Sequence, residues 1–403
     1  MRLASILIFS LCLAAAVASA STINVPAQQP TIQDGINAAN TGDTVLVAPG
    51  TYLENINFNG KAITVTSSGG AAATIINGGA LAPVAAFVTS EGAASVLSGF
   101  TLENGYATFA FQYEGGGISI SFASPTIKNN IITNNNGNGD GGGIGIYWGS
   151  PTVTGNVISN NTAQFGGGVS IVGSSTARFL HNTIRNNTAG DGGAFELFGA
   201  GSVLIEDNYI AGNSGSQGGG LWIVNEADEI IVQNLFVKNT AGSGSQVYSL
   251  IPQSISGFVL VNNTIVSPAN SSADAAVIAD GFNTNVQIIN NIISAGGTEA
   301  GLLCNPIYQD GPPIVHYNDS TAPQGVSFGD SCTGFEGENG NISADPDFVN
   351  AAKNNYQLLG TSPAINAGTN SAPDLLKKDF AGHLRIVGGT IDQGAYEYQG
   401  TTN

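Results

Sequence analysis

Asparagine recurs every 26 residues through the middle of the chain, and this spacing constrains the fold more than any other feature. One series comprises Asn130, Asn156, Asn182, Asn208 and Asn234 and continues, with slightly longer steps, at Asn263 and Asn291. A second series with the same step comprises Asn135, Asn161, Asn187, Asn213 and Asn239. The residues three before and two after each member of the first series are all apolar. A fixed period of this length is typical of a protein built from stacked repeats.

Glycine-rich triplets mark a third repeated position. Gly141-Gly142-Gly143 is followed by apolar residues at alternate positions, Ile144 and Ile146. Equivalent triplets begin at Gly115, Gly166, Gly192 and Gly218. Alternation with a period of two predicts a strand with one buried face.

A repeat of this length holds about three short strands and cannot bury its apolar side alone. Stacked coils can, because each strand then pairs in parallel with its equivalent about 4.8 Å away. Asparagines at identical turns would form ladders of side-chain amides. We therefore predict an all-β fold, a right-handed parallel β-helix with about 26 residues and three strands per coil.

The first twenty residues have the pattern of a secretory signal peptide. Arg2 supplies a positive start, residues 3–17 are apolar, and Ala18-Ser19-Ala20 matches a cleavage site. We predict that residues 1–20 are removed and that the protein works outside the cell or on its surface. No later stretch is long and apolar enough to predict a membrane span.

The two ends of the predicted solenoid need caps, because a terminal coil exposes a sheet edge. Residues 30–52 supply the first cap, with Ile32, Ile36 and Ala39 on one face of a short helix and a first strand at residues 44–47. We predict that residues 21–342 form the β-helix with this cap, and that residues 343–403 form a C-terminal capping module.

Two cysteines remain after the signal peptide. Cys304 and Cys332 are 28 residues apart, close to one coil length, so they would lie on neighbouring coils. In an oxidising compartment this spacing favours a disulfide. Two buried thiols are the alternative.

The charge balance restricts the partners. The formal net charge is −18, which repels nucleic acid and anionic lipid, and neither is predicted as a partner. Because 42% of the residues are hydrophobic and only 9% are charged, the chain is not a disordered polyanion.

Three segments resemble known families. Residues 31–56, with Gly50-Thr51-Tyr52-Leu53-Glu54 as a G-x-Y-x-E signature, resemble the opening of pectin-lyase-like β-helix proteins such as pectin methylesterases. Gly192-Gly193-Ala194-Phe195 and Phe236-Val237-Lys238-Asn239 resemble the repeats of bacterial polymorphic outer membrane proteins. Residues 344–398 are similar to the choice-of-anchor Q module of bacterial secreted β-helix proteins. These resemblances imply a secreted or surface protein, and the further signatures of pectin-degrading enzymes are absent.

Four carboxylates are the candidate catalytic residues. Glu114, Asp140 and Asp191 share the column before the glycine triplets, and Glu196 faces outward on the following strand. Adjacent coils would place Glu114 and Asp140 about 5 Å apart, and two coil steps would place Asp140 and Asp191 about 10 Å apart. Glycosidases need a carboxylate pair at similar separations. The alternatives are a Ca²⁺ site, which such a column also suits, and acidic residues that only solvate the turn.

Four aromatic residues are the candidate ligand-binding residues. Tyr147, Phe198 and Trp222 face outward on the strands after the triplets, and Trp148 follows at a strand end. Aromatic rings on a polar surface are suited to stacking against sugar rings. The alternative is that a loop or the C-terminal module covers them.

The segments that form this face contain no positively charged residues. The five segments around the triplets contain no Lys, Arg or His, whereas Lys128, Arg185 and Lys238 lie on other turns and look scattered. A lyase acting on polyuronate needs a base and positive charge, so this activity is disfavoured unless Ca²⁺ supplies the charge.

We therefore predict a secreted or surface protein, glycan-binding or scaffold-like, with a polysaccharide or cell-surface glycan as partner and no cofactor unless Ca²⁺ is bound. The alternative is a polysaccharide-active enzyme, a glycoside hydrolase rather than a lyase.

Overall fold

The computed structural model describes residues 20–108, 115–225, 228–251, 257–281, 285–305 and 313–400. The predicted signal peptide, apart from its last residue, lies outside the described residues. No described helix is long and apolar enough to cross a membrane.

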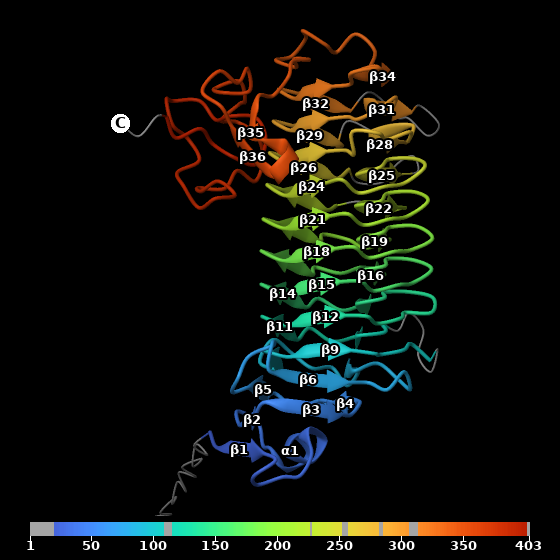
Figure 1. Ribbon diagram of the computed structural model, residues 1–403, viewed down its shortest axis with the longest axis vertical. Helices are drawn as coiled ribbons and strands as arrows, with labels where there is room; N and C mark the ends of the chain where they lie inside the picture. Colours follow the sequence, from blue (N-terminus) through green and yellow to red (C-terminus); the bar gives the residue numbers. More distant parts are fainter. Residues whose placement is uncertain are drawn as a thin grey trace, which may run out of the picture.

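Three long parallel sheets run the length of the molecule (Figure 1). Sheet A contains, in spatial order, β1 (Thr22–Val25), β2 (Thr44–Val47), β5 (Thr64–Ser67), β8 (Val96–Ser98), β11 (Thr126–Lys128), β14 (Thr152–Thr154), β17 (Arg178–Leu180), β20 (Leu204–Glu206), β23 (Ile230–Val232), β26 (Val259–Val261), β29 (Gln287–Ile289) and β32 (Ile314–His316). Sheet B contains β3 (Gly50–Leu53), β6 (Thr74–Asn77), β9 (Thr101–Glu103), β12 (Ile131–Thr133), β15 (Val157–Ser159), β18 (Thr183–Arg185), β21 (Tyr209–Ala211), β24 (Leu235–Val237), β27 (Thr264–Val266), β30 (Ile292–Ser294) and β33 (Asp319–Thr321). Sheet C contains β4 (Ile56–Asn57), β7 (Ala85–Phe87), β10 (Ile118–Ser121), β13 (Ile144–Tyr147), β16 (Val169–Val172), β19 (Phe195–Phe198), β22 (Leu221–Val224), β25 (Val247–Leu250), β28 (Ala275–Asp280), β31 (Ala300–Asn305) and β34 (Phe328–Asp330).

Each coil contributes one strand to each sheet, which confirms the predicted parallel β-helix. The register aligns equivalent residues, so Ile144 pairs with Ile118 on one side and with Val169 on the other. Ile144 and Ile146 are buried in one continuous apolar core, as the alternating pattern predicts. The solenoid also begins earlier than predicted: β1 precedes the cap helix and pairs with β2, so residues 44–47 form the second strand of sheet A.

Two asparagine ladders line the interior of the turns. In the first, Asn182 Nδ2 donates to Asn208 Oδ1 at 3.0 Å, and Asn208 donates to Asn234 in the same way. The ladder continues past the predicted series to Asn318 and Asn341. The second ladder runs to Asn239, whose amide donates to Gln246 Oε1 at 2.8 Å, so a glutamine takes the next rung.

The N-terminal cap is held by a carboxylate from the G-x-Y-x-E segment. Helix α1 (Ile32–Ala38) begins after Thr31, whose side chain accepts a hydrogen bond from the Asp34 N–H. Glu54 accepts hydrogen bonds from the N–H groups of Ile32 at 2.9 Å and Gln33 at 3.0 Å. These are orphan donors of the first helical turn, where the helix dipole also favours negative charge. Glu54 therefore has a structural role in joining α1 to the coil below.

Replacing Glu54 with glutamine is expected to lower the free energy of unfolding by about 1 kcal/mol, since the neutral amide offers one oxygen and no charge to this helix end. Urea denaturation followed by circular dichroism measures the change. Exposed Glu336 provides the matched control, and Glu336→Gln is expected to leave stability unaltered. Equal stability of the two variants would contradict the capping role.

The C-terminal region lies against the flank of the upper coils (Figure 1). β35 (Phe348–Asn350) and β36 (Asn355–Leu358) form an antiparallel hairpin joined by the short helix η2 (Ala351–Lys353). Tyr356 and Ala395 pack on Leu235, Val237 and Val266 of sheet B. At the end of the solenoid, Cys304 of β31 and Cys332 form a disulfide with their Cα atoms 5.4 Å apart.

Candidate functional site

The predicted site residues that the structure describes lie on the outer face of sheet C or in the turns beside it. Since side chains alternate along a strand, Glu196 and Phe198 both project outward from β19 while Phe195 and Leu197 enter the core. Glu114 lies outside the described residues. The proposed pairing of Glu114 with Asp140 therefore stays a prediction.

Glu196 is the most perturbed acid on this face. Its side chain is only 4% exposed. Burial raises its pKa to about 8, the Ser170 hydroxyl that donates to Oε2 at 2.6 Å opposes the rise, and the charges of Asp140 and Asp191 add to it. Glu196 is therefore protonated at neutral pH, the state required of a general acid.

Asp140 and Asp191 lie in the turns beside Glu196, two coils apart as predicted. Their backbones are linked through Phe165, which bridges to both. Burial raises the pKa of Asp140 to about 6. Asp191 Oδ1 accepts a hydrogen bond from the Gln217 N–H at 3.1 Å, so this carboxylate braces the turn of the next coil. Asp191 therefore has a structural contact in the turn, which was one of the alternatives for the acidic residues of this column.

The described part of this column contains no cluster of potential metal ligands. Across the described ranges, no three His, Cys, Asp or Glu side chains are grouped so as to hold a metal ion. Asp191 already uses one oxygen for the turn. Ca²⁺ also takes backbone carbonyl and amide oxygens as ligands, so the Ca²⁺ alternative stays a prediction.

Trp222 is set apart from the other predicted aromatic residues. Its ring stacks on Phe165, with ring centroids 6.0 Å apart and an interplanar angle of 12°. Its Nε1 is buried without a hydrogen-bond partner in the described part of the chain. Trp222 is therefore half-buried, with the ring of Phe165 from a neighbouring turn packed against it.

The other three aromatic residues line one open cavity. Tyr147, Trp148 and Phe198 lie at the ends of β13 and β19 around a cavity of about 370 Å³. Trp148 is 49% exposed and Phe198 is 41% exposed. The wall is completed by Val172, Gly173, Ser174, Gly199 and Asn225. None of these lining residues is charged.

The backbone at this cavity holds aromatic residues in an unusual conformation. Trp148 has a φ of 49°, and Phe122, one coil below, has a φ of 50°. The equivalent positions on the next coils are Gly173, Gly199 and Asn225, which suit a left-handed backbone. A bulky residue in the left-handed backbone conformation costs about 1–2 kcal/mol of stability. Such backbone strain is often found at functional sites.

The neighbouring coil makes room for the Trp148 ring. A Cβ added to Gly173 would lie 2.5 Å from Trp148 Nε1, so the indole rests directly against this glycine. A Cβ added to Gly199 would meet nothing within 4 Å, which shows that the cavity is open there.

Phe122 was not among the predicted site residues. It is 61% exposed and its ring meets Tyr147 edge-on, with centroids 5.3 Å apart. The signal was present in the repeat, because Phe122 follows Ser121 as Trp148 follows Tyr147. We call Phe122, Tyr147, Trp148 and Phe198 the aromatic platform.

Comparisons with known proteins agree with this architecture. The family model described as "Right handed beta helix region" matches residues 57–241 and 152–293. No curated protein matches the chain. Among solved structures, the crystal structure of pectate lyase Pel9A is similar at 18% identity with a TM-score of 0.54, over 91% of this chain and 90% of that one. The structure of the PL6 family alginate lyase AlyGC matches at 14% identity and a TM-score of 0.40, over 82% of this chain and 54% of that one.

At such low identities the structural likeness establishes the fold alone. The family matches together cover more than half of the chain. They include the aromatic platform and the acids Asp140, Asp191 and Glu196. The chain belongs to the right-handed β-helix family.

Proposed function

We propose that this protein binds an uncharged carbohydrate chain at the aromatic platform and does so outside the cell. The observation that carries the proposal is the open cavity of about 370 Å³ walled by Tyr147, Trp148 and Phe198. The pattern of residues 1–20 and the disulfide support a location outside the cytoplasm.

The lining matches the chemistry of a sugar. Aromatic rings offer flat apolar surface for the C–H face of a pyranose, and polar groups at the rim orient its hydroxyls. Ser174 and Asn225 supply a hydroxyl and an amide at the edge of the cavity. Since the cavity wall carries no charge, an uncharged glycan suits it better than an acidic one.

A polysaccharide-cleaving enzyme is the second candidate, and the state of Glu196 favours it. This acid is protonated at neutral pH and lies two residues before Phe198 on the same face of β19. The fold likeness to a pectate lyase supports a carbohydrate ligand in general. Binding ranks first because Glu196 is buried and is absent from the cavity wall.

An array of uncharged plant and microbial glycans, followed by calorimetry on each hit, tests the proposal. Trp148→Ala is expected to weaken binding about tenfold, the loss of one stacked ring. The matched control is Leu384→Ala, which removes an exposed apolar side chain from the C-terminal region. Binding that is unchanged in Trp148→Ala would contradict the proposal.

Chromatography of the bound glycan after long incubation separates the two candidates. Intact glycan supports binding alone. Shortened products that disappear in Glu196→Gln would establish the hydrolase instead.

A further inference from the structure

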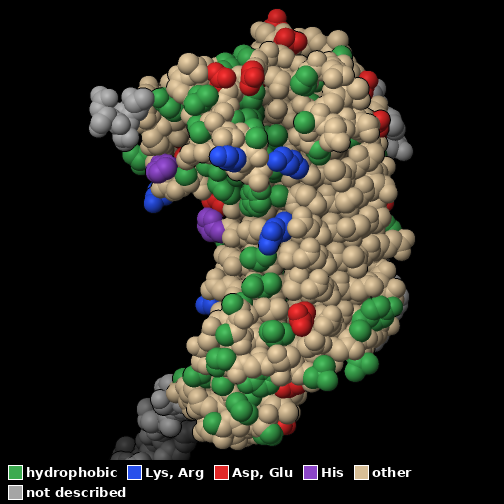
Figure 2. Space-filling view, viewed as in Figure 1, with side chains coloured by type: hydrophobic (Ala, Val, Ile, Leu, Met, Phe, Trp, Pro, Cys, Tyr) green, Lys and Arg blue, Asp and Glu red, His purple; other side chains and the backbone are tan. Residues whose placement is uncertain are grey.

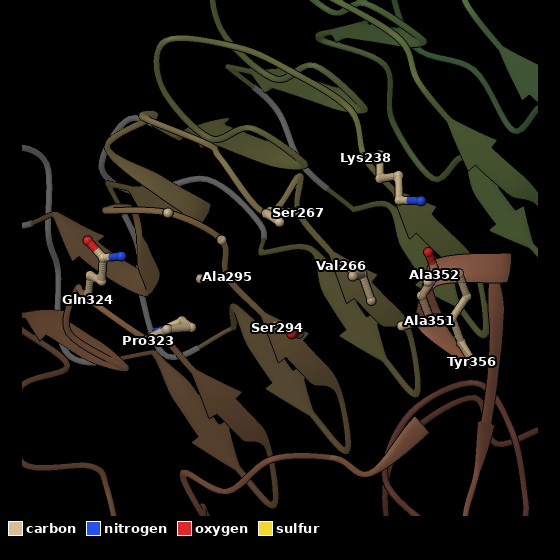
Figure 3. A pocket seen from close by; sticks show the side chains of 13 residues that line it. Lys238, Val266, Ser267, Ser294, Ala295, Pro323, Gln324, Ala351, Ala352 and Tyr356 are labelled. Atoms are coloured by element: carbon tan, nitrogen blue, oxygen red, sulfur yellow. The ribbon is translucent and has the colours of Figure 1, made fainter. Parts of the chain in front are cut away.

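A second groove crosses sheet B on a different face of the solenoid. A cavity of about 490 Å³ lies between the turns after β24, β27 and β30 and the C-terminal region, with Lys238 and Tyr356 at one end and Pro323 and Gln324 at the other (Figure 3). A cavity of about 220 Å³ adjoins it and shares Lys238. A third, of about 320 Å³, shares Ser294 and Pro323.

These three cavities form one elongated groove, which we call the flank groove. It extends across the strands from Arg185 of β18 to Thr321 of β33. Five strand spacings separate β18 from β33, so the groove is about 24 Å long. Its shape therefore suits a linear chain lying along the axis of the solenoid.

One end of the flank groove is positively charged. Arg185 and Lys238 line the same cavity, with Tyr209 on the coil between them. The prediction that the cations are scattered is therefore wrong for these two, whereas Lys128 lies apart on sheet A. The two residues are 53 positions apart, and only the stacking of coils brings them within two strand spacings. Figure 2 shows Lys and Arg side chains beside an apolar strip on this face.

Both cations keep hydrogen-bond donors for a ligand. Neither forms a salt bridge with any residue in the described ranges. Lys238 Nζ donates to Asn354 Oδ1 at 2.9 Å, which leaves two of its three donors. The chain has only 10 Lys and Arg residues against 28 Asp and Glu, so two cations in one cavity are unusual for this surface.

The floor of the flank groove is unsuited to an extended peptide. Its backbone groups already bond to the next coil, as when the N–H of Lys238 donates to Val266 O at 2.7 Å and that of Ser267 to Ser294 O at 3.0 Å. A peptide strand binds by adding to a free sheet edge, and the groove crosses the interior of the sheet. Hydroxyl groups, the Tyr209 ring and two cations remain for a ligand to contact, whereas the end of the groove near Pro323 carries the carboxylate of Asp345.

We propose that the flank groove binds a linear acidic oligosaccharide, with its anionic groups at Arg185 and Lys238 and its chain running toward Pro323. The anionic group is a carboxylate or a sulfate, because guanidinium and ammonium groups bind both. This site is separate from the aromatic platform, and its existence does not depend on the function proposed there.

Isothermal titration calorimetry on the full chain tests this inference. The probes are an oligogalacturonate, a sulfated oligosaccharide of equal length, the fully methyl-esterified and hence uncharged oligogalacturonate, and an oligoglutamate peptide. We expect at least one of the two acidic oligosaccharides to bind, and the esterified one to bind at least tenfold more weakly. Which acidic probe binds identifies the anionic group.

The variants locate the site. Arg185→Gln and Lys238→Gln are each expected to weaken acidic binding about tenfold, the loss of one charge-assisted hydrogen bond. Lys128→Gln removes a cation from sheet A, outside the groove, and is expected to have no effect. Trp148→Ala is expected to leave acidic binding intact, so a failure at the aromatic platform does not affect this result.

Three results would overturn the inference. These are no binding of either acidic oligosaccharide, binding that survives the double substitution of Arg185 and Lys238, and tighter binding of oligoglutamate than of both oligosaccharides.

Discussion

Asn182→Ala is expected to lower the free energy of unfolding by at least about 3 kcal/mol, because four buried hydrogen bonds disappear together. Asn182 is 1% exposed. Its Nδ2 donates to Val153 O at 2.9 Å and to Asn208 Oδ1 at 3.0 Å. Its Oδ1 accepts from the backbone N–H of Asn156 at 2.9 Å and from its Nδ2 at 3.1 Å. Removing the side chain takes the acceptor from the buried backbone N–H of Asn156. Asn208 Oδ1 keeps one donor, the backbone N–H of residue 182.

Chemical denaturation at several urea concentrations measures this effect. Asn160→Gly is the matched control, since Asn160 is an exposed asparagine with a left-handed backbone that glycine also adopts. We expect a change of less than about 1 kcal/mol for the control. A loss in Asn182→Ala no larger than that of Asn160→Gly would show that the ladder contributes little to stability.

Raising the pH from 5 to 8 is expected to destabilise the protein, and Glu196 is expected to account for about 3 kcal/mol of the loss. The folded state holds the Glu196 proton up to a pKa of about 8, whereas the unfolded chain releases it near the model value of 4.5. Between these values the folded state binds more protons than the unfolded state. Stability is therefore fully present below pH 4.5 and decreases until the pH passes 8.

Burial raises the pKa of Asp140 to about 6 and of Asp319 to about 7, and these groups act in the same direction. Glu196→Gln isolates the contribution of Glu196, because the amide stays neutral at every pH. We expect the free energy of unfolding of this variant to decrease less between pH 5 and 8 than that of the wild type. At pH 9 we expect the variant to be the more stable of the two. Glu336→Gln serves as the control with an exposed carboxyl. If the stability of Glu196→Gln decreased with pH as steeply as that of the wild type, Glu196 would not be the source of the loss.

The repeated residues made most of the fold predictable. The 26-residue step of Asn156, Asn182 and Asn208 required identical turns, and the alternation at Ile144 and Ile146 identified the inward face of sheet C. Both features depend on local sequence repeated at a constant period. Where the spacing departed from this period, the sequence no longer predicted the ladder. The rungs at Asn318 and Asn341 and the glutamine rung at Gln246 lie at irregular steps and were missed.

The candidate site was only partly predictable. Tyr147, Trp148 and Phe198 could be placed on one face from the repeat alone, and the structure finds them around one cavity. The sequence could not show that Phe165 stacks on Trp222 or that Glu196 is buried, because both depend on how turns fold over the sheet.

Identical positions contact each other on adjacent coils. For this reason the repeat alone predicts the period, the three strands of each coil, the inward apolar residues and the asparagine ladders. Which outward side chains reach solvent, and which distant residues share a cavity, depends on how the turns and the C-terminal region pack against the coils. Arg185 and Lys238 meet across two coils, and the C-terminal region folds back on sheet B to wall their groove. These contacts join positions that are not equivalent in the repeat, so the periodicity of the sequence does not predict them.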